Sequence, residues 1–176
     1  MVYLLLVDGF EEIEALTPVD VLRRCGAEIC TVGVDSKRVI GAHNIPVECD
    51  ILLGEVQKET MEMLILPGGP GHTALKTEKV QKLVTYAHEN GIYIASICAA
   101  PSVLGEMGLL AGKKATCFPG FEQALIGAEL SADKVVADGK YITAKGAGAA
   151  GEFAFVLAEL MCGEKTAREI KDAMQY

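Results

Sequence analysis

The chain of 176 residues contains no tryptophan, only three histidines and no cluster of basic residues, and its formal net charge is -8. A strongly acidic chain without a basic patch is poorly suited to binding nucleic acid or an anionic membrane surface. All of its apolar runs are far shorter than the ~20 residues that a membrane-spanning helix requires. We therefore expect neither nucleic acid nor a membrane among its partners.

The six cysteines lack the paired spacing of metal sites, because none forms a C-x-x-C motif and none is spaced from a histidine as in a zinc finger. We therefore expect no structural metal. Residues 2–7 form an apolar run directly after Met1, without a basic leader or a small-residue cleavage site. This run predicts a strand and not a signal peptide. Reduced thiols and a cytoplasmic location are the corresponding expectations.

Hydrophobic residues account for 51% of the chain, and apolar runs with the length of strands alternate with helical patterns along it. This alternation predicts an α/β fold in one domain, residues 1–176, with a mostly parallel sheet covered by helices on both faces. The Asp138-Gly139 pair predicts a hairpin. The expected strands are residues 2–7, 28–34, 61–66, 92–97, 134–137 and 141–144, and the expected longer helices are residues 77–89, 151–161 and 164–174.

Two alternatives are open for the first helix. Thr17 and Pro18 resemble a helix start, with a hydroxyl cap followed by proline at the first helical position, and Asp20 stands three residues after the cap. Alternatively, one longer helix begins near Glu11 and is kinked at Pro18. The sequence does not decide between them.

The stretch GIYIASICAAP (residues 91–101) contains the strongest candidate for a reactive group. An apolar run ends at Cys98, and a helical pattern follows at once, so the chain must turn tightly there between the small residues Ser96 and Ala100. This is the position of the nucleophile in a nucleophile elbow, where free N–H groups and a helix dipole lower the pKa of a thiol. The alternative is that Cys98 is a buried small hydrophobe, as many free cysteines are.

Three other turns are expected at the carboxyl ends of strands, at residues 8–14, 67–71 and 145–151. Ligand sites of parallel sheets gather at these ends. The turns converge with Cys98 on one crevice only if their strands are neighbours in the sheet. Gly68-Gly69 is either a plain turn or, together with the N–H of Ala99, a source of donors for an oxyanion.

Acidic residues in the turn after the first strand are ordinarily solvated carboxylates at a helix N-terminus. One of Glu11, Glu12 and Glu14 placed against a thiolate in an apolar pocket would instead stay protonated and serve as a general acid and base. Of the three histidines, only His72, just after the glycine turn, is a candidate for this site.

Five motifs together resemble the ThiJ/PfpI superfamily, and within it the DJ-one/YajL-like branch: DGFEEIE (8–14), PVDVLRR (18–24), LPGG (66–69), ICAAP (97–101) and KGAG (145–148). The likeness covers nearly the whole chain. It implies a flavodoxin-like three-layer sandwich and a homodimer. It also implies that Cys98 is the reactive cysteine, that Glu14 is its carboxylic acid partner, and that Gly69 and Ala99 supply backbone N–H groups.

Departures from the family pattern modify this expectation. The protease branch carries a histidine directly after the cysteine, where Ala99 stands here, and this argues against peptidase activity. Phe118 stands where some members have a histidine, so we expect an aromatic lid at that point. Residues 145–148 replace an Arg-Gly-Pro-Gly pattern, which we expect to loosen the loop over the pocket. The other residues expected to line the pocket are Gly68, His72, Gly146 and Ala147.

The resemblance implies a cysteine-dependent enzyme of the glyoxalase III or deglycase type. Such an enzyme acts on methylglyoxal-like aldehydes or their protein and nucleotide adducts, and it needs no cofactor or metal. Two alternatives remain: a non-enzymatic redox sensor or chaperone in the oxidative stress response, and, less favoured, a peptidase or amidase. The enzyme and the redox sensor predict the same site residues, so the sequence does not separate these two functions. We interpret the other five cysteines as structural or incidental.

Overall fold

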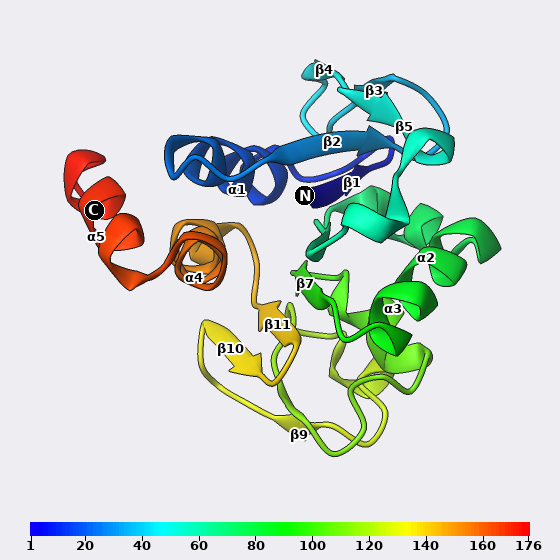
Figure 1. Cartoon of the computed structure of the whole chain (residues 1–176). Helices are drawn as coiled ribbons and strands as arrows, with labels where there is room; N and C mark the ends of the chain where they lie inside the picture. The colour runs from blue at the N-terminus through cyan, green and yellow to red at the C-terminus, as the bar shows by residue number, and fades with distance from the viewer.

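The computed structural model describes residues 1–176, which form a central seven-stranded sheet between two layers of helices (Figure 1). The strand order is β10-β11-β7-β6-β1-β2-β5, and all neighbouring strands are parallel except the β10–β11 hairpin. The predicted α/β fold with a mostly parallel sheet is therefore confirmed. The strands are β1 (Val2–Leu6), β2 (Ile29–Gly33), β5 (Ile51–Leu52), β6 (Met63–Leu66), β7 (Tyr93–Ile97), β10 (Val135–Asp138) and β11 (Tyr141–Ala144).

Helices cover the sheet on both faces, α1 (Glu12–Arg24) and α4 (Ala150–Cys162) on one and α2 (Glu78–Glu89) and α3 (Pro101–Glu106) on the other. Alternate residues of each strand point to opposite faces, so β1 contributes Leu4 to the core under α1 and α4, and Leu5 to the core under α2 and α3. This burial on both faces explains the continuous apolar strands. None of the helices combines the length and the apolar character needed to cross a bilayer.

Smaller elements complete the chain. The helix α5 (Glu164–Ala173) packs against α4, and two short strand pairs lie outside the central sheet. These pairs are β3 (Arg38–Ile40) with β4 (Pro46–Glu48), and β8 (Lys114–Ala115) with β9 (Glu129–Leu130). The 3-10 turns are η1 (Leu53–Glu55), η2 (Lys58–Thr60), η3 (Pro70–Lys76), η4 (Glu122–Ala124) and η5 (Ala147–Ala149).

The first helix is continuous from Glu12 to Arg24 and contains Pro18. The alternative in which it begins at Thr17 is therefore wrong. Proline removes one backbone hydrogen bond from a helix interior. Here α1 packs along α4 and buries Val19, Val21 and Leu22, and we attribute the persistence of the helix to this packing. The longer helix places Glu14 in its first turn.

We predict opposite effects for alanine at two helical glycines, although alanine is intrinsically better than glycine in a helix by ~1 kcal/mol. At Gly105 in α3, a Cβ would lie 2.2 Å from the backbone oxygen of Ala124. At Gly151 in α4, the closest atom is in the ring of Tyr176, 2.7 Å away, and that exposed C-terminal side chain can move aside. We expect Gly105→Ala to lower the free energy of unfolding by ~1–3 kcal/mol. Gly151→Ala is expected to leave it unchanged or to raise it by up to ~1 kcal/mol.

Urea unfolding of both variants beside the wild type measures these differences. Equal stability changes at the two positions would contradict the close backbone contact between α3 and the segment at Ala124.

Candidate active site

Four neighbouring strands, β1, β6, β7 and β11, carry the four turns singled out in the sequence at their carboxyl ends. The condition that these strands be neighbours is therefore confirmed. Because the strands are parallel, the four turns lie at the same edge of the sheet. Glu14 follows β1, Gly68 and Gly69 follow β6, Cys98 follows β7, and Gly146 and Ala147 follow β11.

Cys98 occupies the turn between β7 and α3 with a φ of +65°, which is uncommon for a residue other than glycine. Its backbone is held on both sides. The N–H of Cys98 donates to the oxygen of Ala144 at 2.9 Å, and the oxygen of Cys98 accepts from the N–H of Phe118 at 2.8 Å. The half-buried side chain faces Glu14, with which it forms a hydrogen bond.

Glu14 is 1% exposed and lies directly against the sulfur of Cys98. Its Oε2 accepts a hydrogen bond from the N–H of Gly68 at 3.0 Å, and the carboxylate also accepts one from the N–H of Ala147. Burial raises the pKa of Glu14 to about 7, although these hydrogen bonds act in the opposite direction. Glu14 is therefore a carboxyl group that can hold or release a proton near neutral pH.

The thiol does not have the lowered pKa that the sequence analysis predicted. Burial, followed by the charge of Glu14, raises the pKa of Cys98 to about 12, while hydrogen bonds from the N–H groups of Gly69 and Ala99 lower it. The prediction counted these donors and the helix dipole but neither the desolvation nor the second charge. Because the two groups are in contact, they titrate as a pair and share one proton between about pH 7 and about pH 12. When the proton is on Glu14, its carboxyl group is neutral and no longer repels a thiolate at Cys98.

Two glycines allow the backbone to approach this pair. A Cβ at Gly68 would lie 2.6 Å from the Cβ of Cys98 and 2.7 Å from Oε2 of Glu14. Gly69 has a φ of +100°, and a Cβ there would lie 2.5 Å from the oxygen of Gly9. Side chains at these positions would displace the N–H groups that now face the carboxylate and the sulfur. The Gly68-Gly69 turn therefore supplies donors to both groups, which a plain turn would not do.

A cavity of about 460 Å³ begins at the loop beside Glu14. A Cβ at Gly146 would touch both the ring of Phe118, at 3.2 Å, and Oε1 of Glu14, at 3.7 Å, so this glycine separates the cavity from the carboxylate. Phe118 is 46% exposed. The lining residues are Phe118, Pro119, Lys134, Lys145, Gly146, Ala147, Gly148 and Ala149.

Three of the residues predicted to line a pocket, Phe118, Gly146 and Ala147, line this cavity. Two do not. Gly68 lies between Glu14 and Cys98, and Nδ1 of His72 lies 3.1 Å from the oxygen of Gly69 while its ring packs against Phe121.

Sequence reasoning did not single out the other five lining residues, Pro119, Lys134, Lys145, Gly148 and Ala149, although the last three lie in the turn expected at residues 145–151. The hairpin signal at Asp138-Gly139 contained the information for Lys134. Pairing Asp138 with Tyr141 puts Lys134 next to Lys145, and the N–H of Lys145 donates to the oxygen of Lys134 at 3.0 Å.

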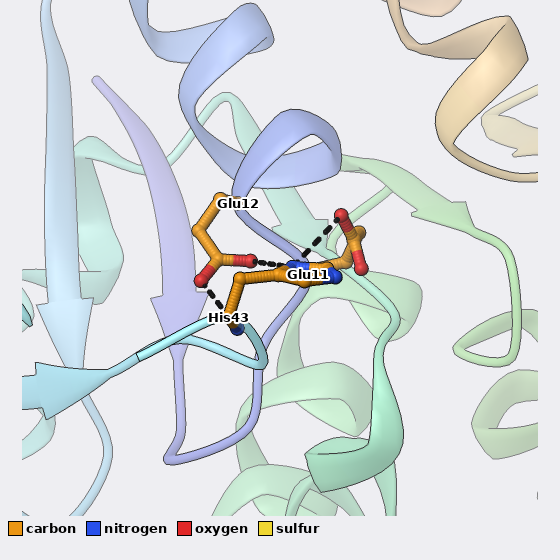
Figure 2. A group of neighbouring side chains, drawn as sticks. All are labelled: Glu11, Glu12 and His43. Atoms are coloured by element: carbon orange, nitrogen blue, oxygen red, sulfur yellow. Dashed lines mark hydrogen bonds and ion pairs between the residues drawn. The ribbon is translucent and has the colours of Figure 1, made fainter. Parts of the chain in front are cut away.

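Glu11, Glu12 and His43 form a second cluster, shown in Figure 2. The Glu12 carboxylate accepts a hydrogen bond from the backbone N–H of His43 and contacts its Nδ1, both at 2.8 Å, and Oε1 of Glu11 lies 3.8 Å from the same Nδ1. Burial opposes the charge on Glu12, but the hydrogen bonds from His43 lower its pKa, and the bond to Glu12 raises the pKa of His43. Both Glu12 oxygens are thus engaged within the protein. We interpret the cluster as an ion pair that ties the β3–β4 loop to α1.

The fold and the site define a class of α/β proteins in which a cysteine, at the turn after a central parallel strand, faces a buried glutamate. The chain belongs to the DJ-1/PfpI family, whose sequence profile matches residues 1–160. The resemblance inferred from the five motifs is therefore confirmed.

Known proteins are similar over most of the chain. The crystal structure of Drosophila melanogaster DJ-1beta has a TM-score of 0.93 at 31% identity, and the match covers 99% of this chain and 96% of that one. A Caenorhabditis elegans protein named glutathione-independent glyoxalase DJR-1.2 is 34% identical, over 93% of this chain and 89% of its own length. A Pyrococcus horikoshii protein named deglycase PH1704 is 29% identical, over 82% of this chain and 89% of its own length. Protein DJ-1 homolog B of Arabidopsis thaliana is 32% identical over 96% of this chain, which spans only 39% of that protein's length.

We predict that the thiolate absorbance and the alkylation rate of Cys98 rise only at alkaline pH, with an apparent pKa well above 9.0, because burial and the charge of Glu14 raise the pKa of the thiol. Glu14→Gln removes the charge that opposes the thiolate, so the apparent pKa of Cys98 falls and alkylation at neutral pH becomes faster. Cys98→Ser gives the background from the other thiols, and Cys30→Ser is the matched control that keeps the wild-type profile. An ordinary cysteine titration, identical in the wild type and in Glu14→Gln, would show that the two groups are not coupled.

Proposed function

We propose that the protein is a cofactor-independent enzyme that converts 2-oxoaldehydes such as methylglyoxal into 2-hydroxy acids. One observation carries the proposal: the sulfur of Cys98 is hydrogen-bonded to a buried carboxyl group whose pKa lies near neutrality. Such a pair can provide a thiolate and, beside it, a group that moves protons. The glyoxalase name of the Caenorhabditis elegans relative supports the same chemistry.

The first step is attack of the Cys98 thiolate on the aldehyde carbon. A carbon–sulfur bond forms, and the former carbonyl oxygen takes the proton held by Glu14, giving a hemithioacetal. The N–H groups of Gly69 and Ala99, which face the sulfur, are in position to donate to that oxygen as its charge develops. We thus interpret the positive-φ turn at Cys98 as a nucleophile elbow.

The second step moves hydrogen between adjacent carbons. The Glu14 carboxylate removes the proton of the former aldehyde carbon and returns it to the ketone carbon, while a hydroxyl proton passes between the two oxygens. The first carbon thereby becomes a thioester carbonyl and the second becomes an alcohol. Water then cleaves the thioester, releasing the 2-hydroxy acid and the thiol. One carbon is oxidised as its neighbour is reduced, so the balance requires no external oxidant or reductant.

Deglycation shares the first step, attack of the thiolate on a carbonyl-derived carbon, but acts on an adduct that an amine or thiol has formed with the aldehyde. The deglycase name of the Pyrococcus horikoshii relative supports this variant. Amide hydrolysis is less well supported. Such hydrolysis ordinarily uses a histidine beside the cysteine, and each of the three histidines has a different partner. His43 contacts Glu12, His72 contacts the backbone oxygen of Gly69, and His88 contacts the hydroxyl of Tyr141.

A redox sensor without turnover is the second candidate function. The geometry that favours it is the Glu14 carboxyl at the sulfur, because a protonated carboxyl can donate a hydrogen bond to a sulfinate formed by peroxide. The two functions differ in their dependence on the proton. Catalysis requires Glu14 to give and take a proton, whereas stabilisation of an oxidised sulfur requires only a donor, which an amide also provides.

We predict that purified protein converts methylglyoxal into lactate and that Cys98→Ser abolishes this activity. Glu14→Gln is expected to lower kcat by ~10²–10⁴-fold, because proton transfer is lost while the pocket remains. Cys30→Ser and Glu152→Gln are matched controls outside the site and keep the wild-type rate. Lactate formation and peroxide-dependent sulfinate formation, the latter by mass spectrometry, are measured on the same samples. Sulfinate formation in both the wild type and Glu14→Gln, with no lactate from either, would support the sensor and contradict the enzyme.

A further inference from the structure

Two lysines at the cavity beside the candidate active site, Lys134 and Lys145, form no ion pair within the protein. Most basic side chains of the chain either form an ion pair or lie over an aromatic ring. Four have neither kind of partner: Lys37, Arg38, Lys134 and Lys145. Two of these four line one cavity, although the chain as a whole carries a net charge of -8.

The carboxylate closest in sequence, Asp133, is close enough for the charge of Lys145 to help lower its pKa, but it forms its ion pair with Lys114. Its Oδ2 accepts from Nζ of Lys114 at 3.0 Å and from Oγ of Ser131 at 2.8 Å. Nζ of Lys145 donates to the backbone oxygen of Ala132 at 2.6 Å, which fixes the side chain and leaves the other two hydrogens of the ammonium group. No acidic residue is among those that line the cavity.

The rest of the lining is apolar or backbone. Phe118, Pro119, Ala147 and Ala149 supply apolar surface, and Gly146 and Gly148 supply bare backbone. The volume of about 460 Å³ lies in the range of pockets that hold ligands much larger than methylglyoxal, whose five heavy atoms would fill only a small part of it. The cavity begins at Gly146, next to Glu14, so a substrate whose reacting end passes this glycine to reach the Glu14–Cys98 pair would have its other end in the cavity, toward the lysines.

We propose that Lys134 and Lys145 form a subsite for the carboxylate of the substrate, so that the enzyme prefers 2-oxoaldehydes that carry a carboxylate at the end remote from the aldehyde. This inference rests on the proposed function for the identity of the reacting group. The reason is electrostatic. An acidic protein repels anions, and two ammonium groups that line the cavity next to Glu14 reverse that repulsion locally.

The test compares two substrates that differ only in charge, 4,5-dioxopentanoate and its methyl ester. Both are 2-oxoaldehydes, and their reaction follows the steps given above. For the wild type we expect a higher kcat/KM with the carboxylate than with the ester, and a smaller difference at high salt. Lys134→Gln and Lys145→Gln are each expected to lower the carboxylate-to-ester ratio about three- to fivefold, and the double variant about tenfold. The rate with the ester is expected to fall much less than the rate with the carboxylate in all of them.

Lys37→Gln is the matched control, because it removes the same charge from an unpaired lysine outside the cavity and leaves the ratio unchanged. Lys134→Arg is expected to retain the preference because it retains the charge. An equal loss of rate with carboxylate and ester would assign the lysines a role in loop structure and overturn the subsite. An unchanged ratio in the double variant would overturn it as well.

A second measurement does not depend on turnover. Iodoacetate and iodoacetamide alkylate the same thiol, and only the former is an anion. The ratio of their rates at Cys98 is expected to fall in Lys134→Gln and Lys145→Gln and to stay constant in Lys37→Gln. If no 2-oxoaldehyde is converted but this ratio still depends on the two lysines, the proposed reaction fails while the anion subsite stands. If turnover is normal and neither ratio responds, the subsite alone is wrong.

Discussion

The contact between the carboxyl of Glu14 and the sulfur of Cys98 is the interaction on which the rest of the site depends. The two residues come from opposite helical layers, since Glu14 belongs to α1 and Cys98 precedes α3. They meet only because β1 and β7 both pair with β6 and end at the same edge of the sheet. Gly68, at the end of β6, has no side chain that would separate them.

Much of this arrangement follows from the sequence. Strands with no polar face require helices on both sides, and helices between successive strands require parallel pairing, so the layers and the edge that carries the site were predictable. The turn at Cys98 was predictable from an apolar run that meets a helical pattern without a linker between them. The identity of the acidic partner was not, because Glu11, Glu12 and Glu14 differ only in the direction that α1 gives them. The resemblance selected Glu14, and the structure buries it against the sulfur.

Other features depend on distances that a sequence does not contain. The sign of the shift in the pKa of Cys98 is decided by burial and by a carboxylate 84 positions away in the chain, which compete with local N–H donors. The continuity of α1 through Pro18 depends on packing against α4, a helix from the other end of the chain. His72 follows the glycine turn directly, yet the 3-10 turn η3 directs its ring toward Phe121. In each case tertiary contacts outweigh a local preference.

Proton binding at the site also bears on the stability of the fold. Glu14 and Cys98 ordinarily titrate at 4.5 and 9.0, whereas in the folded protein the pair releases its protons at about 7 and about 12. Between pH 4.5 and about 7, and again between pH 9.0 and about 12, the folded state binds more protons than the unfolded state. The free energy of unfolding therefore falls as the pH rises through each of these two intervals. The pair thus opposes folding under the conditions in which the thiolate forms. Apolar side chains at both positions would remove this loss, so the fold itself does not require a cysteine that faces a buried glutamate.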